Sequence, residues 1–382
     1  MRPDIPNRPV LLNSYISTGI LGMYYSTVQY TVLNFSRHFL IPLPIMGILI
    51  FVQSFGMCVA PIFFGVMSEK HGKRRALLIA YALVVVGTLL IGITPVLWIY
   101  IAAVFLTGSG FSVIEATLCA VLTDEFPNHA VRHVNFAQVI FSVGALTAPM
   151  IVERLMLGGV FFKSLFIYYS IIFAVLGMAF FFTKQRNDIA RSDGDRKRSA
   201  IGPLLKNGVF LMFAICIFLY VGMESSLANY AKNYFEIELS APQFSAIALS
   251  LFWGFMIPSR LLAGVVRLDL KKIFIIFFSI ILIATLAAML IPLNPGKLVA
   301  FAVCGFGCGP LWPLLMNIAA KKSPESSGLI MNMMSSAGSL GGALIPLLSG
   351  IIAGTVVPSA AYYLCCFIAI TMFILFLRAE KK

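Results

Sequence analysis

Twelve continuous apolar runs constrain this chain more than any other feature. A helix needs about 20 apolar residues to cross a bilayer, and runs that are continuously apolar, rather than alternating, predict helices and not the strands of a barrel. The sequence therefore predicts an all-α membrane protein with twelve transmembrane helices. The expected spans are residues 10–34, 45–67, 76–94, 96–122, 134–156, 164–182, 209–234, 243–266, 273–292, 298–320, 328–354 and 358–377.

Composition agrees with a chain whose solvent is lipid. Hydrophobic residues make up 60% of the chain and charged residues 11%, whereas a soluble domain carries roughly 25% charged residues. The net charge of +13 comes from short basic clusters between the apolar runs, which is typical of membrane loops rather than of a nucleic-acid surface. We therefore expect the lipid bilayer as a partner and no nucleic acid.

The distribution of basic residues predicts the orientation of the chain. Both ends and the loops expected on their side carry 22 Lys and Arg residues, whereas the opposite loops carry Arg37, Lys163 and Lys297. Lys and Arg accumulate in cytoplasmic loops. The sequence predicts a multi-pass protein of the inner (cytoplasmic) membrane with both termini in the cytoplasm.

The longest polar stretch, residues 183–208, divides the chain into two halves of six helices, 1–182 and 209–382. We interpret it as a cytoplasmic linker. A shift of 197 residues aligns several glycines, prolines and asparagines of the two halves, so we predict pseudo-symmetric parallel repeats related by an axis along the membrane normal. The aligned pairs are Gly108 and Gly305, Gly110 and Gly307, Pro127 and Pro324, Asn135 and Asn332, Gly144 and Gly341, and Pro149 and Pro346.

The loop after the second span reads GVMSEKHGKRR from Gly65 onward. It resembles the signature G-x-x-x-[DE]-[RK]-x-G-[RK]-[RK] of the major facilitator superfamily. Gly65 permits close helix approach and Gly72 permits a tight turn. Glu69, Arg74 and Arg75 can form a charge network that biases one conformation of the two halves.

Most of the chain resembles the fucose–proton symporter family of that superfamily. Residues 108–127, 134–149 and 219–226 are similar to the family's Gly-rich fourth helix, its N-x-A-Q segment and its Y-V-G-x-[EQ] segment. The resemblance implies a secondary transporter of a sugar-like solute. Sugar–proton members carry an acid in the first helix, whereas this chain has none there; Gln29 and Tyr30 fall near the expected place.

Charges inside a membrane are costly and mark functional positions. Glu115 matches the family's fourth-helix Glu, which implies proton coupling and solute contact; burial disfavours a charged carboxylate, so such a group can load and release a proton. The alternatives are a structural pair with Arg260 or Arg154 and a carboxyl that only holds a contact between helices. For Glu224 in the seventh helix, solute contact and a structural bond are equal alternatives. Lys232 is expected to extend toward the membrane surface.

Neutral polar and aromatic side chains complete the predicted solute site. Gln138 and Asn135 are three residues apart on one helix face, and their amides both donate and accept hydrogen bonds, as a polyol requires. Gln53 and Trp312, which occupies the repeat position of Glu115, are further candidates. The alternatives are hydrogen bonds between helices for the amides and packing for the aromatic ring.

The preferred function is proton-coupled transport of a sugar or related solute by alternating access, with a small-molecule solute and protons as partners. An exporter or facilitator of other small organic molecules is the alternative. The spans carry no nucleophile constellation and no paired histidines, so we expect neither an enzyme nor a receptor. We expect a monomer with no cofactor and no metal site; the seven cysteines lie in apolar runs without metal-binding spacing.

Overall fold

A computed structural model gives the fold. It describes residues 8–126, 130–183, 208–265, 270–312, 314–315 and 327–379. The predicted linker, residues 183–208, lies almost entirely outside these residues, as do Pro127 and Pro324 of the repeat. The side chains of Gly65, Glu69 and Asn135 are also outside the described part, although their helices are within it.

The first six spans are helices, as the apolar runs predict. Helices α1, α2 and α5 extend beyond their apolar runs at both ends, whereas α6 matches its run. Gly72 separates the second helix from the third and has a φ of 89°, a backbone conformation that glycine adopts without strain. The helices are α1 (Arg8–Phe39), α2 (Leu43–His71), α3 (Lys73–Ile93), α4 (Leu97–Glu125), α5 (Ala130–Leu157) and α6 (Ser164–Phe182).

The remaining six spans are helical as well. The seventh is irregular at its end, where a short helix and a π-helical turn follow the main helix. The tenth is interrupted by a turn at Gly309 and Pro310, after which Leu311, Trp312, Leu314 and Leu315 are helical again. The elements are α8 (Gly208–Asn229), α9 (Ala231–Asn233), η2 (Tyr234–Glu238), η3 (Pro242–Phe244), α10 (Ser245–Val265), α11 (Leu270–Leu290), α12 (Asn294–Cys308), α14 (Ser327–Thr355) and α15 (Ala360–Ala379).

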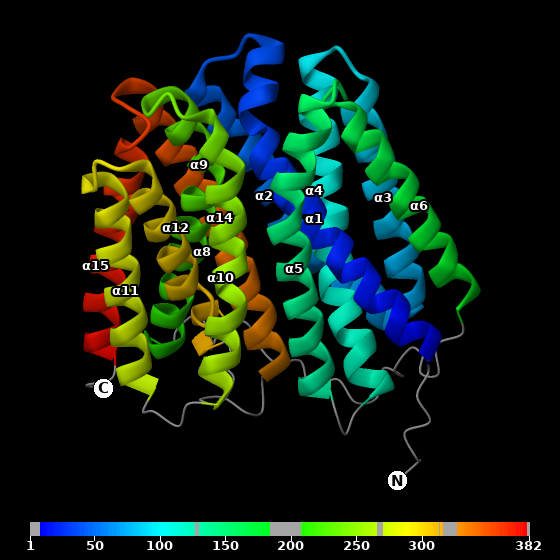
Figure 1. Ribbon diagram of the computed structural model, residues 1–382. Coiled ribbons are helices and arrows are strands. Elements are labelled where there is room, and N and C mark those ends of the chain that lie inside the picture. The colour runs from blue at the N-terminus through cyan, green and yellow to red at the C-terminus, as the bar shows by residue number, and fades with distance from the viewer. Residues whose placement is uncertain are drawn as a thin grey trace. The chain divides into compact units, whose positions relative to one another are not determined.

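The helices form two compact units. Unit 1 comprises Met1–Thr27 and Val52–Lys197, and unit 2 comprises Val28–Phe51 and Arg198–Lys382. In unit 1, α3 packs between α4 and α6; in unit 2, α11 lies beside α12 and α15 (Figure 1). The C-terminal part of α1 and the N-terminal part of α2 thus pack with later helices. The division of the chain at residues 182 and 209 stays a prediction.

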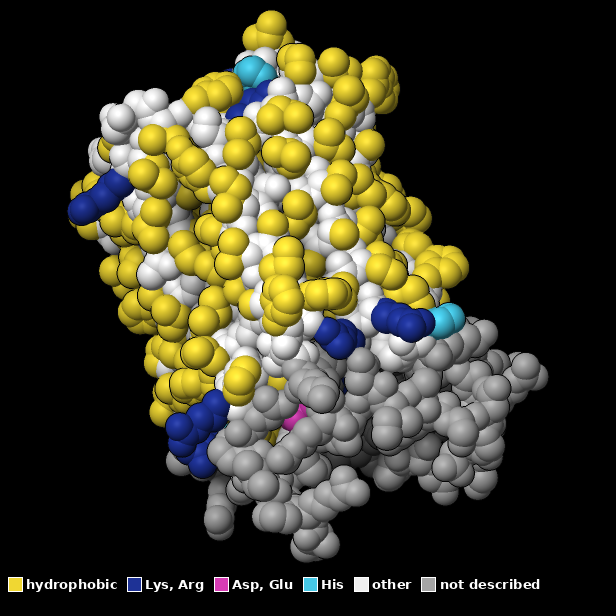
Figure 2. All heavy atoms as spheres, turned by 90° about the vertical axis from the view of Figure 1, so that its right-hand side faces the viewer, with side chains coloured by type: hydrophobic (Ala, Val, Ile, Leu, Met, Phe, Trp, Pro, Cys, Tyr) yellow, Lys and Arg dark blue, Asp and Glu magenta, His cyan; other side chains and the backbone are white. Residues whose placement is uncertain are grey.

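The outer surface is apolar, as a lipid-facing surface must be. Helix α6 buries Phe166, Phe173 and Phe180 and also exposes Ile171 and Val175. A helix that is hydrophobic all round belongs in a membrane or a large core. Figure 2 shows hydrophobic side chains over the face on which α6 lies, with Lys and Arg side chains near its two ends. Nine of the described helices are long and apolar enough to span a membrane by themselves.

Equivalent glycine contacts confirm the repeat. A Cβ atom on Gly110 of α4 would lie 3.0 Å from the Val84 nitrogen of α3, and one on Gly307 of α12 would lie 3.2 Å from the Ile281 nitrogen of α11. Val84 and Ile281 are themselves 197 residues apart. The two halves therefore pack their third and fourth helices in the same way.

A second pair of glycines, Gly144 and Gly341, packs against the first helix of its own half in each case. Gly144 of α5 packs against the carbonyl oxygen of Gly19 in α1, and Gly341 of α14 packs against the carbonyl oxygen of Phe218 in α8. Close backbone approach through small residues drives helix association in lipid. The protein thus has two pseudo-symmetric halves, with α1 and α5 corresponding to α8 and α14.

Candidate functional site

An acid and an amide meet in the interior of unit 1. Glu115 lies near the middle of α4, and Gln138 lies in the first part of α5. Gln138 Nε2 donates a long hydrogen bond of 3.5 Å to Glu115 Oε1, and both side chains are partly accessible. A carboxyl oxygen accepts such a bond in the charged and in the protonated state. Gln138 can therefore hold the carboxyl in place while its proton content changes.

The same amide reaches a second position of α4. Gln138 also interacts with the thiol of Cys119, which is one turn after Glu115 and shares its helix face. Asn135 lies one turn before Gln138 on α5. Gln138 thus bridges two turns of α4.

Gln53 lies at one of the close contacts between α2 and α4. Its carbonyl oxygen occupies the place where a Cβ atom on Gly108 would lie, so a larger residue at Gly108 would separate the helices. The Gln53 side chain is buried, and its Nε2 has no hydrogen-bond partner in the part of the chain that the structure describes. A buried donor without a partner costs about 1–3 kcal/mol, which makes Gln53 a candidate for binding a solute or water.

The two candidates from the first helix lie in unit 2. Gln29 Oε1 accepts a hydrogen bond of 3.1 Å from Trp253 Nε1 of α10. The hydroxyl of Tyr30 is 3.3 Å from Ser245 Oγ, at the start of α10. Both side chains are buried. Neutral contacts to α10 thus occupy the part of α1 where the symporter resemblance implies an acid.

Glu224 belongs to a group of side chains that closes the end of α12. Its carboxyl interacts with the Arg260 guanidinium of α10 and with the Tyr220 hydroxyl. Arg260 Nε donates to the carbonyl oxygen of Gly309 at 3.0 Å, and Tyr220 donates to that of Cys308 at 2.9 Å. The last carbonyls of a helix lack partners within it, and a cation there is favourable. Arg260 therefore caps α12 and balances the charge of Glu224.

Trp312 follows the point at which α12 ends. Its side chain is 36% exposed, and the turn at Gly309 and Pro310 lies between it and α12. Glu115, its repeat partner by sequence, lies within an unbroken helix. The two halves thus differ at this position, one presenting an acid and the other an indole ring.

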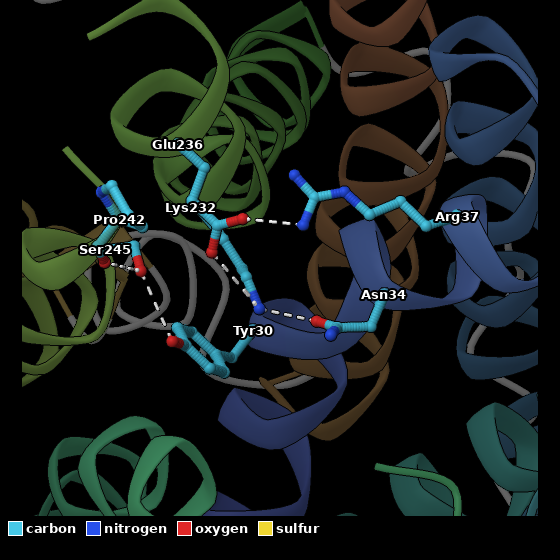
Figure 3. A network of polar contacts seen from close by, with 7 residues as sticks. All are labelled: Tyr30, Asn34, Arg37, Lys232, Glu236, Pro242 and Ser245. Carbon is cyan, nitrogen blue, oxygen red and sulfur yellow. Dashed lines mark hydrogen bonds and ion pairs between the residues drawn. The ribbon is translucent and has the colours of Figure 1, made fainter. Parts of the chain in front are cut away.

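A network of polar contacts ties α1 to α9 and η2 in unit 2 (Figure 3). Lys232 is 3% exposed, so the expectation that it extends toward the membrane surface is wrong. Its ammonium donates to Asn34 Oδ1 at 2.5 Å, lies 4.0 Å from the centre of the Tyr30 ring and is 3.6 Å from Glu236 Oε1. Arg37 Nη1 contacts the other Glu236 oxygen at 3.0 Å. The cation is buried because these partners replace its water.

The signature loop lies at the junction of α2 and α3 in unit 1. Arg74 donates to the carbonyl oxygen of Phe181, near the end of α6, and its guanidinium lies 5.5 Å from the centre of that ring. Lys73 Nζ donates to the carbonyl oxygen of Ala120 in α4 at 3.4 Å. Arg75 is exposed. The loop therefore joins the ends of three helices of its own unit.

The sequence matches the Major Facilitator Superfamily over residues 12–326 and 295–382. The chain belongs to this superfamily. It is 25% identical over 316 residues to the glucose/mannose transporter GlcP of Bacillus subtilis, a match that covers 80% of this chain and 78% of that protein. It is 23% identical to the membrane protein MosC of Rhizobium meliloti, over 81% of this chain and 75% of that protein.

Two solved structures have the same fold. The nucleoside transporter NupG superposes with a TM-score of 0.76 at 12% identity, over 98% of this chain and 99% of that one. A variant of the Escherichia coli fucose–proton symporter FucP superposes with a TM-score of 0.65 at 16% identity, over 96% of this chain and 99% of that one. The superfamily member described here is thus a multi-pass secondary transporter of small solutes, and not an enzyme.

The structure places some of the predicted site residues in contact with one another, and it shows one further residue, Trp253, in contact with them. It brings Glu115 to Gln138 in unit 1, and it joins Gln29 and Tyr30 to α10 in unit 2. Sequence reasoning missed Trp253. The signal that could have found it is an indole N–H within a span, since such a group requires an acceptor when buried.

Proposed function

We propose that this transporter carries a sugar or a related small polar solute by proton-coupled alternating access, with Glu115 as the proton-carrying group. The observation that carries the proposal is the contact between Glu115 and Gln138, two partly accessible polar side chains on neighbouring helices inside the membrane. Groups of this kind are expensive in a bilayer and mark solute or proton pathways.

The chemistry of the candidate residues suits a neutral hydroxylated solute. The amides of Gln138, Gln53 and Gln29 each offer donors and an acceptor, and the Glu115 carboxyl offers acceptors. A sugar hydroxyl both donates and accepts, so it can satisfy either kind of group. The sequence similarity to a glucose/mannose transporter supports the same solute class.

We prefer Glu115 to Glu224 for the proton because Glu115 is at the position of the fourth-helix Glu of the symporter family that the sequence resembles. The Glu224 carboxyl interacts with Tyr220 and Arg260, which also donate to the carbonyl oxygens at the end of α12. The Glu115 carboxyl accepts a hydrogen bond from the Gln138 amide, and it can do so in either protonation state. A group that carries protons must exchange between both states in each cycle.

The test is accumulation of labelled solutes in proteoliposomes with an inwardly directed proton gradient. D-Glucose, D-mannose, L-fucose and uridine serve as probes. Glu115→Gln preserves the shape and cannot titrate, so it should abolish gradient-driven accumulation and leave exchange between loaded vesicles intact. Glu224→Gln is the matched control, because removing the charge opposite Arg260 should lower accumulation and exchange together. Wild-type accumulation by Glu115→Gln would refute the coupling role.

The alternative function is a facilitator or exporter of other small organic molecules. The absence of an acid from α1 favours it, since Gln29 and Tyr30 cannot share the proton with Glu115. A facilitator would exchange solute at the same rate with and without a pH gradient. That result in the wild-type protein would support the alternative and remove Glu115 from coupling.

We further propose that the protein is a monomer of the inner membrane with both termini in the cytoplasm. The asymmetry of 22 basic residues against three supports the orientation, and one chain supplies both six-helix halves. Reporter fusions at residues 2 and 382 test the topology, and light scattering of the purified protein tests the mass. A periplasmic signal at either end would contradict the orientation.

A further inference from the structure

Gln29 and Trp253 form a buried hydrogen-bonded pair in unit 2. They are 224 residues apart, on α1 and α10, and their exposed fractions are 3% and 4%. The indole Nε1 donates to Gln29 Oε1 at 3.1 Å. Both residues lie within a single compact unit, so one rigid packing arrangement holds the pair.

The partner determines which way the amide of Gln29 points. The two ends of a glutamine amide are nearly indistinguishable by shape, so their assignment depends on the hydrogen bonds they make. An indole N–H is a donor with no acceptor capacity. It must therefore face the amide oxygen, and the NH₂ group of Gln29 must point away from Trp253.

That NH₂ group has no hydrogen-bond partner among the described residues, although it is buried. Buried donors are rarely left unpaired in native proteins, because the lost hydration is not replaced. The hydrogen bond that joins α1 to α10 uses only the amide oxygen of Gln29. The NH₂ group of the same amide is therefore available to bind a ligand.

We infer that Trp253 is a positioning residue that holds Gln29 so that its NH₂ group donates a hydrogen bond to an acceptor oxygen of the transported solute. This inference rests on the proposed transport of a small polar solute, and it narrows the solute class. A fixed neutral donor recognises a hydroxyl or carbonyl oxygen. It gives nothing to an ammonium group, which has no lone pair to accept the bond.

The inference also gives a physical account of the missing acid in α1. A glutamine does not titrate, so at this position α1 supplies recognition without a proton. A carboxylate at this position would accept hydrogen bonds from the solute. Gln29, held by Trp253, instead presents an NH₂ group that donates one. The solute oxygen that meets Gln29 must consequently be an acceptor in every step of the cycle.

The test is a double-mutant cycle measured by exchange of labelled D-glucose between loaded proteoliposomes, which requires no proton gradient. The four proteins are the wild type, Gln29→Met, Trp253→Phe and the double variant. Gln29→Met should raise KM about tenfold with little change in kcat, because one hydrogen bond to the solute is lost. Trp253→Phe should raise KM about threefold to fivefold, because the amide remains but is no longer held.

The decisive readout is the coupling between the two positions. Trp253→Phe should have no further effect on KM in the Gln29→Met background. One monodeoxyglucose, lacking the hydroxyl that Gln29 contacts, should show the same KM with all four proteins. Trp98→Phe repeats the substitution at an indole that is 77% exposed and should leave KM unchanged.

Two results would overturn the inference. One is an equal rise in KM on Trp253→Phe in both backgrounds, which is the behaviour of a packing residue. The other is a wild-type KM for Gln29→Met. If the wild-type protein exchanges uridine and none of the sugars, the proposed sugar class is wrong but the role of Gln29 is not yet contradicted. The same double-mutant cycle, measured with uridine and its deoxy analogues, then decides that role. Wild-type protein that exchanges none of these probes contradicts both proposals.

Discussion

Lys232 donates a hydrogen bond of 2.5 Å to Asn34 Oδ1 and thereby joins α9 to α1 within unit 2. The ammonium is buried between this amide, the Tyr30 ring and the Glu236 carboxylate. A buried charge is tolerable when its partners replace its hydration. The contact shows that the C-terminal part of α1 is held by polar interactions as well as by packing.

Replacing this cation should therefore destabilise the protein. Lys232→Met removes the charge that balances Glu236, whose side chain is 11% exposed, and should cost about 2–4 kcal/mol. Arg37→Met is the matched control, because Arg37 is 58% exposed and its ion pair should contribute about 0–1 kcal/mol. Thermal unfolding in detergent measures both. Equal shifts in melting temperature for the two variants would contradict the role assigned to Lys232.

Arg260 and Glu224 should behave as a coupled pair. Arg260→Met leaves the Glu224 carboxyl without its cation and the Gly309 carbonyl without its donor, which should cost about 3–5 kcal/mol. Adding Glu224→Gln removes the unbalanced charge and should recover part of the loss. Folded yield and melting temperature of the single and double variants give the coupling. Simple additivity would show that the two charges do not stabilise each other.

The repeat predicts matched sensitivity at Gly144 and Gly341. An added methyl group would meet the carbonyl oxygen of Gly19 in one half and that of Phe218 in the other. Each Gly→Ala substitution should cost about 1–3 kcal/mol through overpacking. Gly208→Ala is the control, because no atom lies within 4 Å of the added carbon. The melting temperatures of the variants measure this effect. A loss of stability for Gly144→Ala without a loss for Gly341→Ala would argue against equivalent packing in the two halves.

Arg74 and Arg75 should affect the transport rate more than solute affinity. Arg74 holds the end of α6 through the Phe181 carbonyl and ring, contacts together worth about 1–2 kcal/mol. Arg74→Ala should slow exchange about tenfold and leave solute binding by calorimetry unchanged; Arg75→Ala, at an exposed position, should have a smaller effect in the same direction. Weakened binding with a normal exchange rate would assign these residues to the solute site instead.

The sequence by itself determined the number of spans, the repeat and the positions of the intramembrane charges. These are local properties: the length of an apolar run must match the bilayer, and each residue of the run carries that information independently. The offset of 197 residues can also be found without a structure, because it comes from aligning the sequence with itself. The equivalent contacts of Gly110 and Gly307 confirm it. Within the candidate site, the sequence could nominate Glu115, Gln138 and Gln29 by residue type.

The tertiary structure alone decided which partner each polar side chain has. Gln29 meets Trp253 across 224 residues of sequence, and Lys232 is buried against Asn34 rather than extended to the membrane surface. The same is true of residues 28–51, which pack with the second unit although they precede the linker. The reason is physical: burial in lipid forces a polar group to find a partner, but which partner lies within about 3 Å depends on how distant helices pack.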